Sequence, residues 1–567
     1  MNNFEKKNSV NLDKFFFILF IFIYLYFLFK NYSGNYKSVE SFLFDRNLGL
    51  ANYTNDYFLN NSLHDQISII YKSIGYLNIN LSNDNIGFLL YFIFTTLSLF
   101  YTFKIINKFF LKSNLQEIFL ILIIMGYGLT IFVNGNKSSW ITNHTAVQTF
   151  FVFCLKPIFL WFLFNKKTLG MTIISSIMFL IALKNSWFLM GVAGLYTLIY
   201  SRKNLIWIFL PLIILIYIAS LSPPLDTNQK IFFFENILER DNSEAAFHMQ
   251  PLPYLISLIL SFPISFFLIK KIKIPNEIKN FLYVLLYVSI VNFTFFFFLA
   301  KFGVYFFPEP RLLVLSGTRA LELYEYFFMI SLLVSIFQSN LRYIFKILIL
   351  IFLLNLVTKS PIAIFSAVLV ILSILLIIFS KIKISTHLEN KSICIFLFLL
   401  SLIPGIIYLS YAKFSNGVSV YSYKKIDKWT VNKLNKDNYR IENLISLRNC
   451  DDFILIDLDY SLTSNLISLK SSFNQGTHSN YFNKKVIIES RKRSKIISEL
   501  TKNIADKSFV NDSLISELKN YNVFIILDND QIKYFPKTLR VFNLKNNESI
   551  IDLSNKNSFK SICKNFT

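Results

Sequence analysis

Apolar runs long enough to cross a membrane follow one another from near the N-terminus to about Ser410, and no such run follows that residue. A membrane-spanning helix needs about 20 consecutive, mostly apolar residues. Residues 411–567 have instead the polar composition of a soluble domain. The sequence therefore predicts a transmembrane domain over residues 1–410 and a small soluble domain over residues 411–567. The number of spans then decides on which side of the membrane the soluble domain lies.

The composition supports a membrane protein. Hydrophobic residues make up 54% of the 567 residues, and charged residues make up 16%, against about 25% in soluble domains. The net charge of +23 would suggest a nucleic-acid partner in a soluble protein. Many of the lysines lie in short loops between apolar runs, however, where positive charge records orientation. We therefore expect membrane lipid as a partner and no nucleic acid. The 64 Phe and 30 Tyr residues accompany abundant Ile, Asn and Lys, which is typical of AT-rich genomes.

The first apolar run covers residues 15–29 and follows Lys6, Lys7 and Lys14. No small-residue cleavage site follows it, which favours an uncleaved span over a signal peptide. Further spans are predicted near 86–103, 115–133, 146–164, 168–184, 186–200, 205–220, 252–269, 281–300, 321–337, 343–357, 361–379 and 392–410. The expected fold is a polytopic α-helical membrane protein with about 13 spans.

Every second loop between these runs is basic. The basic residues are Lys104, Lys108 and Lys112; Lys166 and Lys167; Arg202 and Lys203; Lys270, Lys271 and Lys273; Arg342 and Lys346; and Lys381 and Lys383. The positive-inside rule assigns these loops to the cytoplasm. The intervening loops, 30–85, 134–145, 221–251 and 301–320, then lie outside. This alternation predicts a cytoplasmic N-terminus and an extracytoplasmic C-terminal domain, although one miscounted span would reverse the side.

The long first outer loop, 30–85, carries Asp56 shortly before a predicted helix over residues 62–77. The helix has one apolar stripe, formed by Leu63, Ile67, Ile70, Ile74 and Leu77. Such a helix lies in the membrane interface or packs on the spans, and both arrangements hold Asp56 near the outer surface. A carboxylate there could act as a general base or bind a metal or a substrate hydroxyl. The alternative is an ordinary solvated loop acid. Asp45 is a second, weaker candidate.

Two further outer loops carry candidate substrate contacts. In loop 221–251, a helix is predicted over Gln229–Ala246, and Glu235 and His248 are the candidates. Their spacing matches no metal-ligand motif, so a solvated acidic helix is the favoured interpretation.

Loop 301–320 carries Arg311 and Arg319 on the side where the positive-inside rule does not require them. The planar guanidinium group suits phosphate because it donates two parallel hydrogen bonds. Glu322 and Glu325 begin the next span, where charge is costly and implies partners or a cavity. Alternatively, Arg319 pairs with Glu322 on one helix face.

The soluble domain alternates strand-like and helix-like runs, which predicts a small α/β fold. The expected strands are Phe453–Ile456, Val486–Ile488, Val523–Leu527 and Leu539–Phe542, and the expected helices are Ile441–Leu447, Lys495–Ala505 and Ser513–Asn520. No Walker or dinucleotide-binding loop is present.

Several smaller features of this domain have weak functional interpretations. Asp457 and Asp459 imitate the metal site of nucleotide-sugar transferases, but three characters match easily by chance. The run Arg491–Arg493 is interpreted as a solvated turn. His478 lies in a polar loop and is a candidate contact to the membrane site. Cys450 and Cys563 could form a disulfide if the domain lies outside the cytoplasm.

Four short segments together resemble the C-type glycosyltransferase superfamily, in its bacterial membrane branch. They are Asn55–Phe58 with the helix behind it, Asn143–Phe164, the turn Lys184–Trp187, and the segment from Pro310 to Arg319. Members of that superfamily are polytopic enzymes that use polyprenyl-phosphate-linked sugars. The resemblance covers most of residues 10–410 and implies that Asp56 is the catalytic acid or base. It also implies that Arg311 or Arg319 binds the lipid phosphate. One departure is that loop one holds a single well-placed acid.

These observations lead us to expect an integral-membrane glycosyltransferase of the bacterial plasma membrane, acting in the cell envelope. It would transfer a hexosyl or pentosyl group from a polyprenyl-phosphate donor to a glycan or protein acceptor outside the cytoplasm. Two alternatives remain: a transporter or flippase of a lipid-linked glycan, and a non-catalytic assembly protein. Any cofactor is unknown, and a divalent metal is left open.

Overall fold

The computed structural model describes residues 18, 21–22, 24–25, 53–60, 83–111, 115–127, 148–220, 225–240, 252–315, 317–339, 346, 349, 443–458, 465, 468, 470–473, 483–544, 547–554 and 559–563. The chain divides into two compact units. Unit 1 contains the described residues up to 25 and from 90 to 349. Unit 2 contains residues 53–60 and 83–89 and the described residues from 443 onwards.

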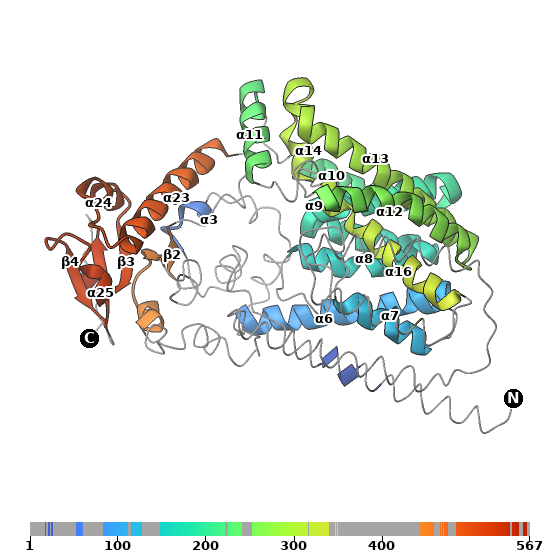
Figure 1. Ribbon diagram of the computed structural model, residues 1–567, viewed down its shortest axis with the longest axis horizontal. Coiled ribbons are helices and arrows are strands. Elements are labelled where there is room, and N and C mark those ends of the chain that lie inside the picture. The colour runs from blue at the N-terminus through green and yellow to red at the C-terminus, as the bar shows by residue number, and fades with distance from the viewer. Residues whose placement is uncertain are drawn as a thin grey trace. The chain divides into compact units, whose positions relative to one another are not determined.

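Unit 1 is helical in its described part (Figure 1). Its elements are α6 (Asn83–Ile105), the π-helix η1 (Ile106–Phe110), α7 (Leu115–Tyr127), α8 (Gln148–Phe164), α9 (Thr168–Tyr200), the 3₁₀-helix η2 (Arg202–Ile208), α10 (Phe209–Ser220), α11 (Thr227–Arg240), α12 (Leu252–Lys271), α13 (Asn276–Phe306), α14 (Pro310–Val314), α15 (Gly317–Ala320) and α16 (Glu322–Gln338).

Helix α9 consists of two helices that meet at Ala182, where the backbone is extended (φ −159°, ψ 98°). The Ser186 hydroxyl donates to the carbonyls of Met178 and Ala182, both at 2.8 Å, and so satisfies carbonyls at the break. Met171 and Tyr200 line one pocket, although a straight helix would separate them by roughly 43 Å. The chain therefore turns back at Ala182.

The loops that the sequence assigns to one side meet at one end of unit 1, which we call the basic end. The contacts are Lys108 Nζ to Asn165 Oδ1, Lys166 Nζ to Glu277 Oε1 at 2.7 Å, Gln338 Nε2 to the Phe110 carbonyl at 3.2 Å, and the Lys273 amide to Gln338 Oε1 at 2.7 Å. Four separate loops are thus joined through polar side chains.

The expectation of about 13 spans, with N-terminus inside and C-terminus outside, is wrong for the described structure. Only α13, 31 residues long, is sufficiently long and apolar to cross a membrane among the described residues. Hydropathy does not reveal that the expected span over 205–220 begins with the 3₁₀-helix η2, which ends at Ile208. The last predicted spans, from 343 onwards, lie almost entirely outside the described residues.

Apolar side chains are exposed along several helices of unit 1. On α13 they recur every three or four residues, at Tyr287, Val291, Phe295, Phe298, Phe302 and Tyr305. On α10 they are Phe209, Leu210, Leu212, Ile213, Ile216 and Tyr217. Helix α16, in contrast, is buried on nearly every side. The unit therefore surrounds α16 and presents apolar surfaces on other helices.

Unit 2 contains a five-stranded sheet of order β2-β1-β3-β5-β4. The strands are β1 (Ile454–Asp457), β2 (Ser471–Ser472), β3 (Val523–Asp528), β4 (Arg540–Asn543) and β5 (Glu548–Leu553). Strands β2, β1 and β3 are parallel, whereas β5 runs antiparallel to both β3 and β4. The helical elements are α3 (Tyr57–Asn60), η4 (Leu447–Asn449), α23 (Lys484–Ala505), α24 (Asp512–Lys519), α25 (Asn529–Ile532) and α26 (Phe559–Ile562).

Side chains cover the sheet on both faces, which explains the continuous apolar runs in β1 and β3. One face packs Ile454, Ile456, Val523 and Ile525 against Ile496, Leu500, Leu514 and Leu518 of α23 and α24. The other packs Leu455, Phe524, Ile526 and Ile550 against Leu444, Leu447 and Phe559. The predicted α/β sheet is therefore confirmed.

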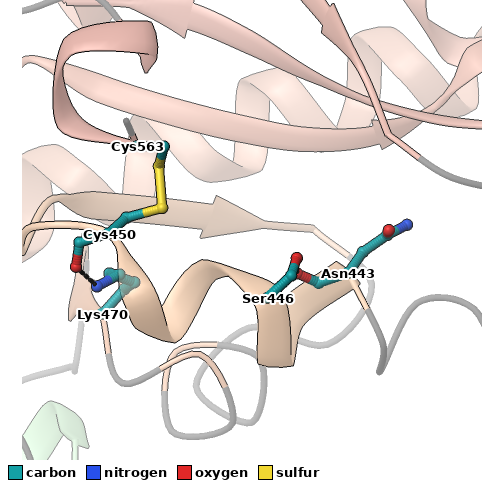
Figure 2. Close-up of a disulfide and its surroundings, with 5 residues drawn as sticks. All are labelled: Asn443, Ser446, Cys450, Lys470 and Cys563. Carbon is teal, nitrogen blue, oxygen red and sulfur yellow. Dashed lines mark hydrogen bonds between the residues drawn. A yellow bond between two sulfur atoms is a disulfide. The ribbon is translucent and has the colours of Figure 1, made fainter. Parts of the chain in front are cut away.

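A disulfide joins Cys450 to Cys563, which are 113 residues apart in sequence (Figure 2). It ties the segment before β1 to α26 at the end of the chain. The Lys470 ammonium donates to the Cys450 carbonyl at 2.6 Å. Burial lowers the pKa of Lys470, and the nearby Asp452 and Asp451 oppose this shift.

Several local predictions for unit 2 are wrong. Residues Val486–Ile488 are helical, because Asn483 caps α23 by accepting from the Val486 amide. The run Arg491–Arg493 belongs to the same helix and is not a turn. Strand β5 was not expected. Helix α11 is described as far as Arg240. The rest of the predicted helix Gln229–Ala246 and the whole of the predicted helix over 62–77 lie outside the described residues.

Candidate functional site

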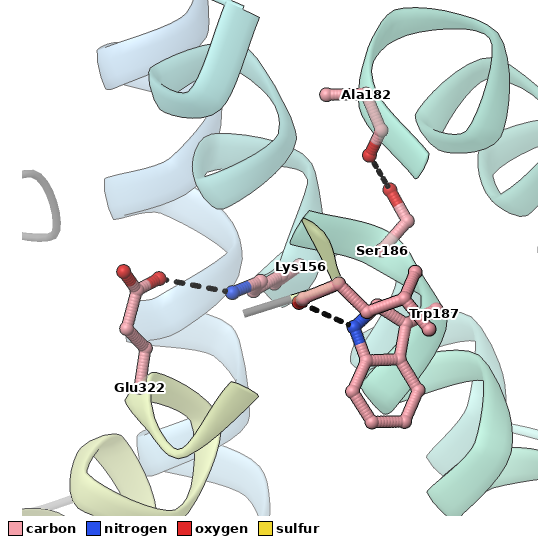
Figure 3. A network of polar contacts seen from close by, with 6 residues as sticks. Lys156, Ala182, Ser186, Trp187 and Glu322 are labelled. Carbon is pink, nitrogen blue, oxygen red and sulfur yellow. Dashed lines mark hydrogen bonds and ion pairs between the residues drawn. The ribbon is translucent and has the colours of Figure 1, made fainter. Parts of the chain in front are cut away.

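A buried ion pair lies inside unit 1, between Lys156 of α8 and Glu322 at the start of α16 (Figure 3). The Nζ and Oε2 atoms are 3.3 Å apart, and the two residues are 5% and 4% exposed. The Lys156 ammonium also lies 5.3 Å from the centre of the Phe153 ring. Charged groups inside an apolar helical unit are expensive and commonly functional.

The segment from Pro310 to Ala320 is held on two sides near this pair. The Trp187 indole donates to the Leu315 carbonyl at 3.0 Å, and the Asn292 amide donates to the Gly317 carbonyl at 2.9 Å. Gly317 is required here, because a Cβ atom would lie 2.3 Å from the Phe296 ring. The segment therefore has a fixed backbone.

Two of the segments that carry the family resemblance thus come together in unit 1. The predicted turn Lys184–Trp187 is helical in the structure and follows the break at Ala182. Its Trp187 contacts the segment that contains both candidate phosphate ligands. Arg311 lies in α14 and is partly buried. Arg319 lies in α15, and its side chain is outside the description. The alternative pairing of Arg319 with Glu322 therefore stays a prediction. The described partner of the Glu322 carboxylate is the Lys156 ammonium.

Lys156 is the functional candidate that sequence reasoning missed. It lies in the middle of the apolar run 146–164, which the hydropathy pattern predicts to be an ordinary span. A single ammonium group at that depth is itself a signal, because it needs a buried partner. Glu322 was recognised as needing one.

Asp56 has a different environment, in unit 2. The residue is 0% exposed, and its Oδ2 accepts the amide hydrogen of Ser472, in β2, at 3.0 Å. Its backbone amide donates to the Tyr53 carbonyl and its carbonyl accepts from the Asn60 amide, both at 3.1 Å. Asp56 therefore lies in a tight turn that leads into α3 and is bound to the edge of the sheet.

Asp452, two residues before β1, binds the residues of this turn that precede Asp56. Its Oδ2 accepts from the Asn55 amide at 2.8 Å and from the Thr54 hydroxyl at 3.1 Å. The Asn55 side chain donates to the Asp452 carbonyl at 2.7 Å. The same carboxylate accepts from the Ser471 amide and hydroxyl, at 3.0 and 2.6 Å. One acid thus connects loop one, β1 and β2.

Arg493 of α23 also binds this part of loop one to the rest of unit 2. Its guanidinium donates to the Phe473 carbonyl at 2.8 Å and to Glu489 at 2.7 Å. The guanidinium carbon is within 4.7–5.3 Å of the centres of four aromatic rings, those of Tyr57, Phe58, Phe473 and Tyr521. We refer to residues 53–60 as the Asp56 segment. It is part of the packed structure of unit 2.

The described structure places none of the remaining candidates beside the Lys156–Glu322 pair or in the Asp56 segment. Glu235 is exposed on α11. Asp45, His248 and His478 lie outside the described residues. Asp457 is buried at the end of β1, and no three His, Cys, Asp or Glu residues within the described ranges form a metal-binding group.

No protein-family model matches the chain, and no curated protein is significantly similar to it in sequence.

Proposed function

We propose that this protein is a membrane-associated glycosyltransferase of the C type. It transfers a sugar from a polyprenyl-phosphate donor to an acceptor outside the cytoplasm. The observation that carries the proposal is the hydrogen bond in unit 1 between Trp187 and the Pro310–Arg319 segment, close to the buried Lys156–Glu322 pair. These segments are two of the four in which the chain resembles that superfamily.

The chemistry of the segment suits a phosphate leaving group. Sugar transfer from a lipid phosphate leaves negative charge on that phosphate, and fixed positive groups stabilise it. Arg311 and Arg319 lie in adjacent short helices, α14 and α15. Trp187 and Asn292 hold the connecting backbone in place. The two guanidinium groups are therefore the proposed phosphate ligands.

Two features support a membrane location with unit 2 in an oxidising compartment. Exposed apolar side chains recur along α13 at Tyr287, Val291, Phe295 and Phe298 and cover much of α10, and contiguous apolar surface of this kind favours contact with lipid. The Cys450–Cys563 disulfide is of a kind that persists outside the reducing cytoplasm.

The burial of Asp56 favours one second candidate, a non-catalytic protein of cell-envelope assembly. A general base must reach the proton that it removes, whereas the Asp56 carboxylate is fully buried with one oxygen bound to the Ser472 amide. By the resemblance, Asp56 is still the proposed catalytic acid or base. Transfer by the unmodified chain decides between transferase and assembly protein, and transfer by the Asp56→Asn variant then decides whether Asp56 is the catalytic group.

The test uses the purified full chain in lipid nanodiscs, with polyprenyl-phosphate donors that carry radiolabelled hexose or pentose. The readout is donor consumption, which counts transfer to water as well as to added glycans. Arg311→Gln should lower the rate about a hundredfold, the usual effect of removing one group that stabilises transition-state charge. Arg540→Gln, an exposed arginine on β4, is the matched control and should keep the rate. Absence of turnover with every donor by correctly folded protein would reject the transferase in favour of the assembly protein.

A further inference from the structure

A groove of about 520 Å³ lies at the basic end of unit 1, where α8 ends and α9 begins. One part of its wall is polar and aromatic, formed by Trp161, Asn165 and Lys167. Another part is aliphatic, formed by Leu169 and Ile173, which are 74% and 48% exposed. The groove therefore combines a cationic edge with an open apolar surface.

Two ammonium groups from α6 and η1 lie over the same indole ring. The Nζ atom of Lys104 is 5.4 Å from the centre of the Trp161 ring, and that of Lys108 is 5.3 Å from it. Lys108 also donates to Asn165 Oδ1, on the polar wall. Both lysines are thus fixed beside the groove.

These positive charges have no neutralising acid in the described part of the chain. Of the lysines around this groove, only Lys166 has a carboxylate within ion-pair distance there, that of Glu277. The Lys104 and Lys108 ammonium groups repel each other, because both lie within 5.4 Å of the centre of the same Trp161 ring. An anion between them would relieve that repulsion.

The backbone beside the groove departs from a regular helix. Residues Ile106–Phe110 form the π-helix η1, which ends where the Leu111 amide donates to the Ile106 carbonyl at 3.0 Å. Single π-turns within α-helices are rare and occur frequently at functional sites. Here the π-turn contains Lys108 and directly follows α6.

We propose that this groove binds an anionic phospholipid. The lipid phosphate lies between Lys104 and Lys108, the headgroup contacts Asn165 and Lys167, and an acyl chain runs along Leu169 and Ile173. The aliphatic wall favours a lipid over free phosphate, because a small anion would leave those side chains uncovered. The site is distinct from the Lys156–Glu322 region and does not depend on sugar transfer.

Tryptophan quenching tests this proposal on the full chain in nanodiscs. Brominated phosphatidylglycerol or brominated phosphatidylcholine is titrated, and the Trp161→Phe variant identifies the part of the quenching that belongs to Trp161. We expect phosphatidylglycerol to quench Trp161 at a much lower mole fraction than phosphatidylcholine. The double variant Lys104→Gln/Lys108→Gln should weaken this preference about thirtyfold, since each lysine near an anionic surface contributes roughly a fivefold factor.

The control removes the same charge elsewhere. In Lys301→Gln/Lys495→Gln, one exposed lysine is lost from α13 and one from α23, and the lipid preference should not change. Equal quenching by the two lipids, or a double variant that behaves like the unmodified protein, would overturn the proposal. Displacement of the brominated lipid by millimolar inorganic phosphate would also overturn it, because it would indicate a site for free anions. None of these results depends on sugar transfer.

Discussion

Replacing Asp56 should loosen the edge of the sheet in unit 2, whatever its role in catalysis. Its carboxylate accepts the Ser472 amide hydrogen in a fully buried position. A hydrogen bond to a charged group contributes about 1.5–3 kcal/mol, and a buried donor left without a partner costs a similar amount. Asp56→Ala should therefore destabilise β2 by about 2 kcal/mol. Asp56→Asn retains an acceptor oxygen and should cost less than about 1 kcal/mol.

Hydrogen exchange followed by mass spectrometry on the full chain measures this difference. At about 2 kcal/mol, amides of β2 and the adjoining β1 should exchange roughly thirtyfold faster in Asp56→Ala if they exchange by local opening. The Asp56→Asn variant should remain close to the unmodified protein. Unchanged exchange in Asp56→Ala would refute the reasoning, because the amide of Ser472 would then be shown not to depend on the carboxylate.

The same pair of variants separates structure from catalysis. If Asp56→Asn keeps normal exchange but loses sugar transfer, the carboxylate has a chemical role. If it keeps both, Asp56 serves to attach loop one to unit 2, and the catalytic assignment fails.

Three further predictions follow from the described contacts. Replacing both Cys450 and Cys563 by Ser should lower the free energy of unfolding of unit 2 by about 4–5 kcal/mol, because the bond closes a loop of 113 residues; a loss below about 1 kcal/mol in denaturant titrations would contradict this. Lys156→Met should cost about 3–5 kcal/mol, and Lys156→Met/Glu322→Leu clearly less than the two single changes together; additive losses in thermal unfolding would argue against the ion pair. Burial lowers the pKa of Lys470, so the unfolded state binds more protons than the folded state between the folded pKa and the ordinary value of 10.5. Unit 2 should therefore gain stability as pH rises through that window, and Lys470→Gln should abolish this gain; an equal gain in the variant would contradict the assignment.

The sequence predicts most of unit 2 because its central strands carry their own signal. Strands β1 and β3 are short continuous apolar runs, as expected of strands covered on both faces. Strand β5 was missed because acids flank its two central isoleucines. In the structure Glu548 accepts from Asn443, and Asp552 accepts from Ser554 and Phe559 amides. The partner of Glu548 is far away in sequence, and the partners of Asp552 are backbone amides, which no residue type identifies. From the sequence alone the two acids therefore resemble loop residues.

Local sequence also could not decide between strand and helix for Val486–Ile488. Three consecutive β-branched residues indicate a strand. The Asn483 cap and the buried Ile496 and Leu500 further along continue one amphipathic helix, and packing against the sheet overrides the local preference.

The sequence predicts some features of the candidate sites and not others, because long-range contacts leave no local pattern. Glu322 was recognised as needing a partner, and Lys156 in the structure supplies it. The contact between Asp56 and Ser472 joins residues 416 positions apart, and no pattern in a single sequence specifies such a pairing. Span counting could predict only that the two regions share a compartment. The structure makes them one folded unit independently of the number of spans.

The most direct test of that central claim is a photo-crosslink from the Asp56 segment in the full chain. A benzoylphenylalanine residue replaces Tyr57, whose ring lies 5.3 Å from the Arg493 guanidinium carbon, and mass spectrometry identifies the linked peptide. We predict crosslinks to the peptides that contain Arg493 or Phe473, and their loss when Arg493→Ala and Asp452→Ala are combined. Crosslinks confined to peptides of unit 1, with none to residues 443–563, would contradict the account.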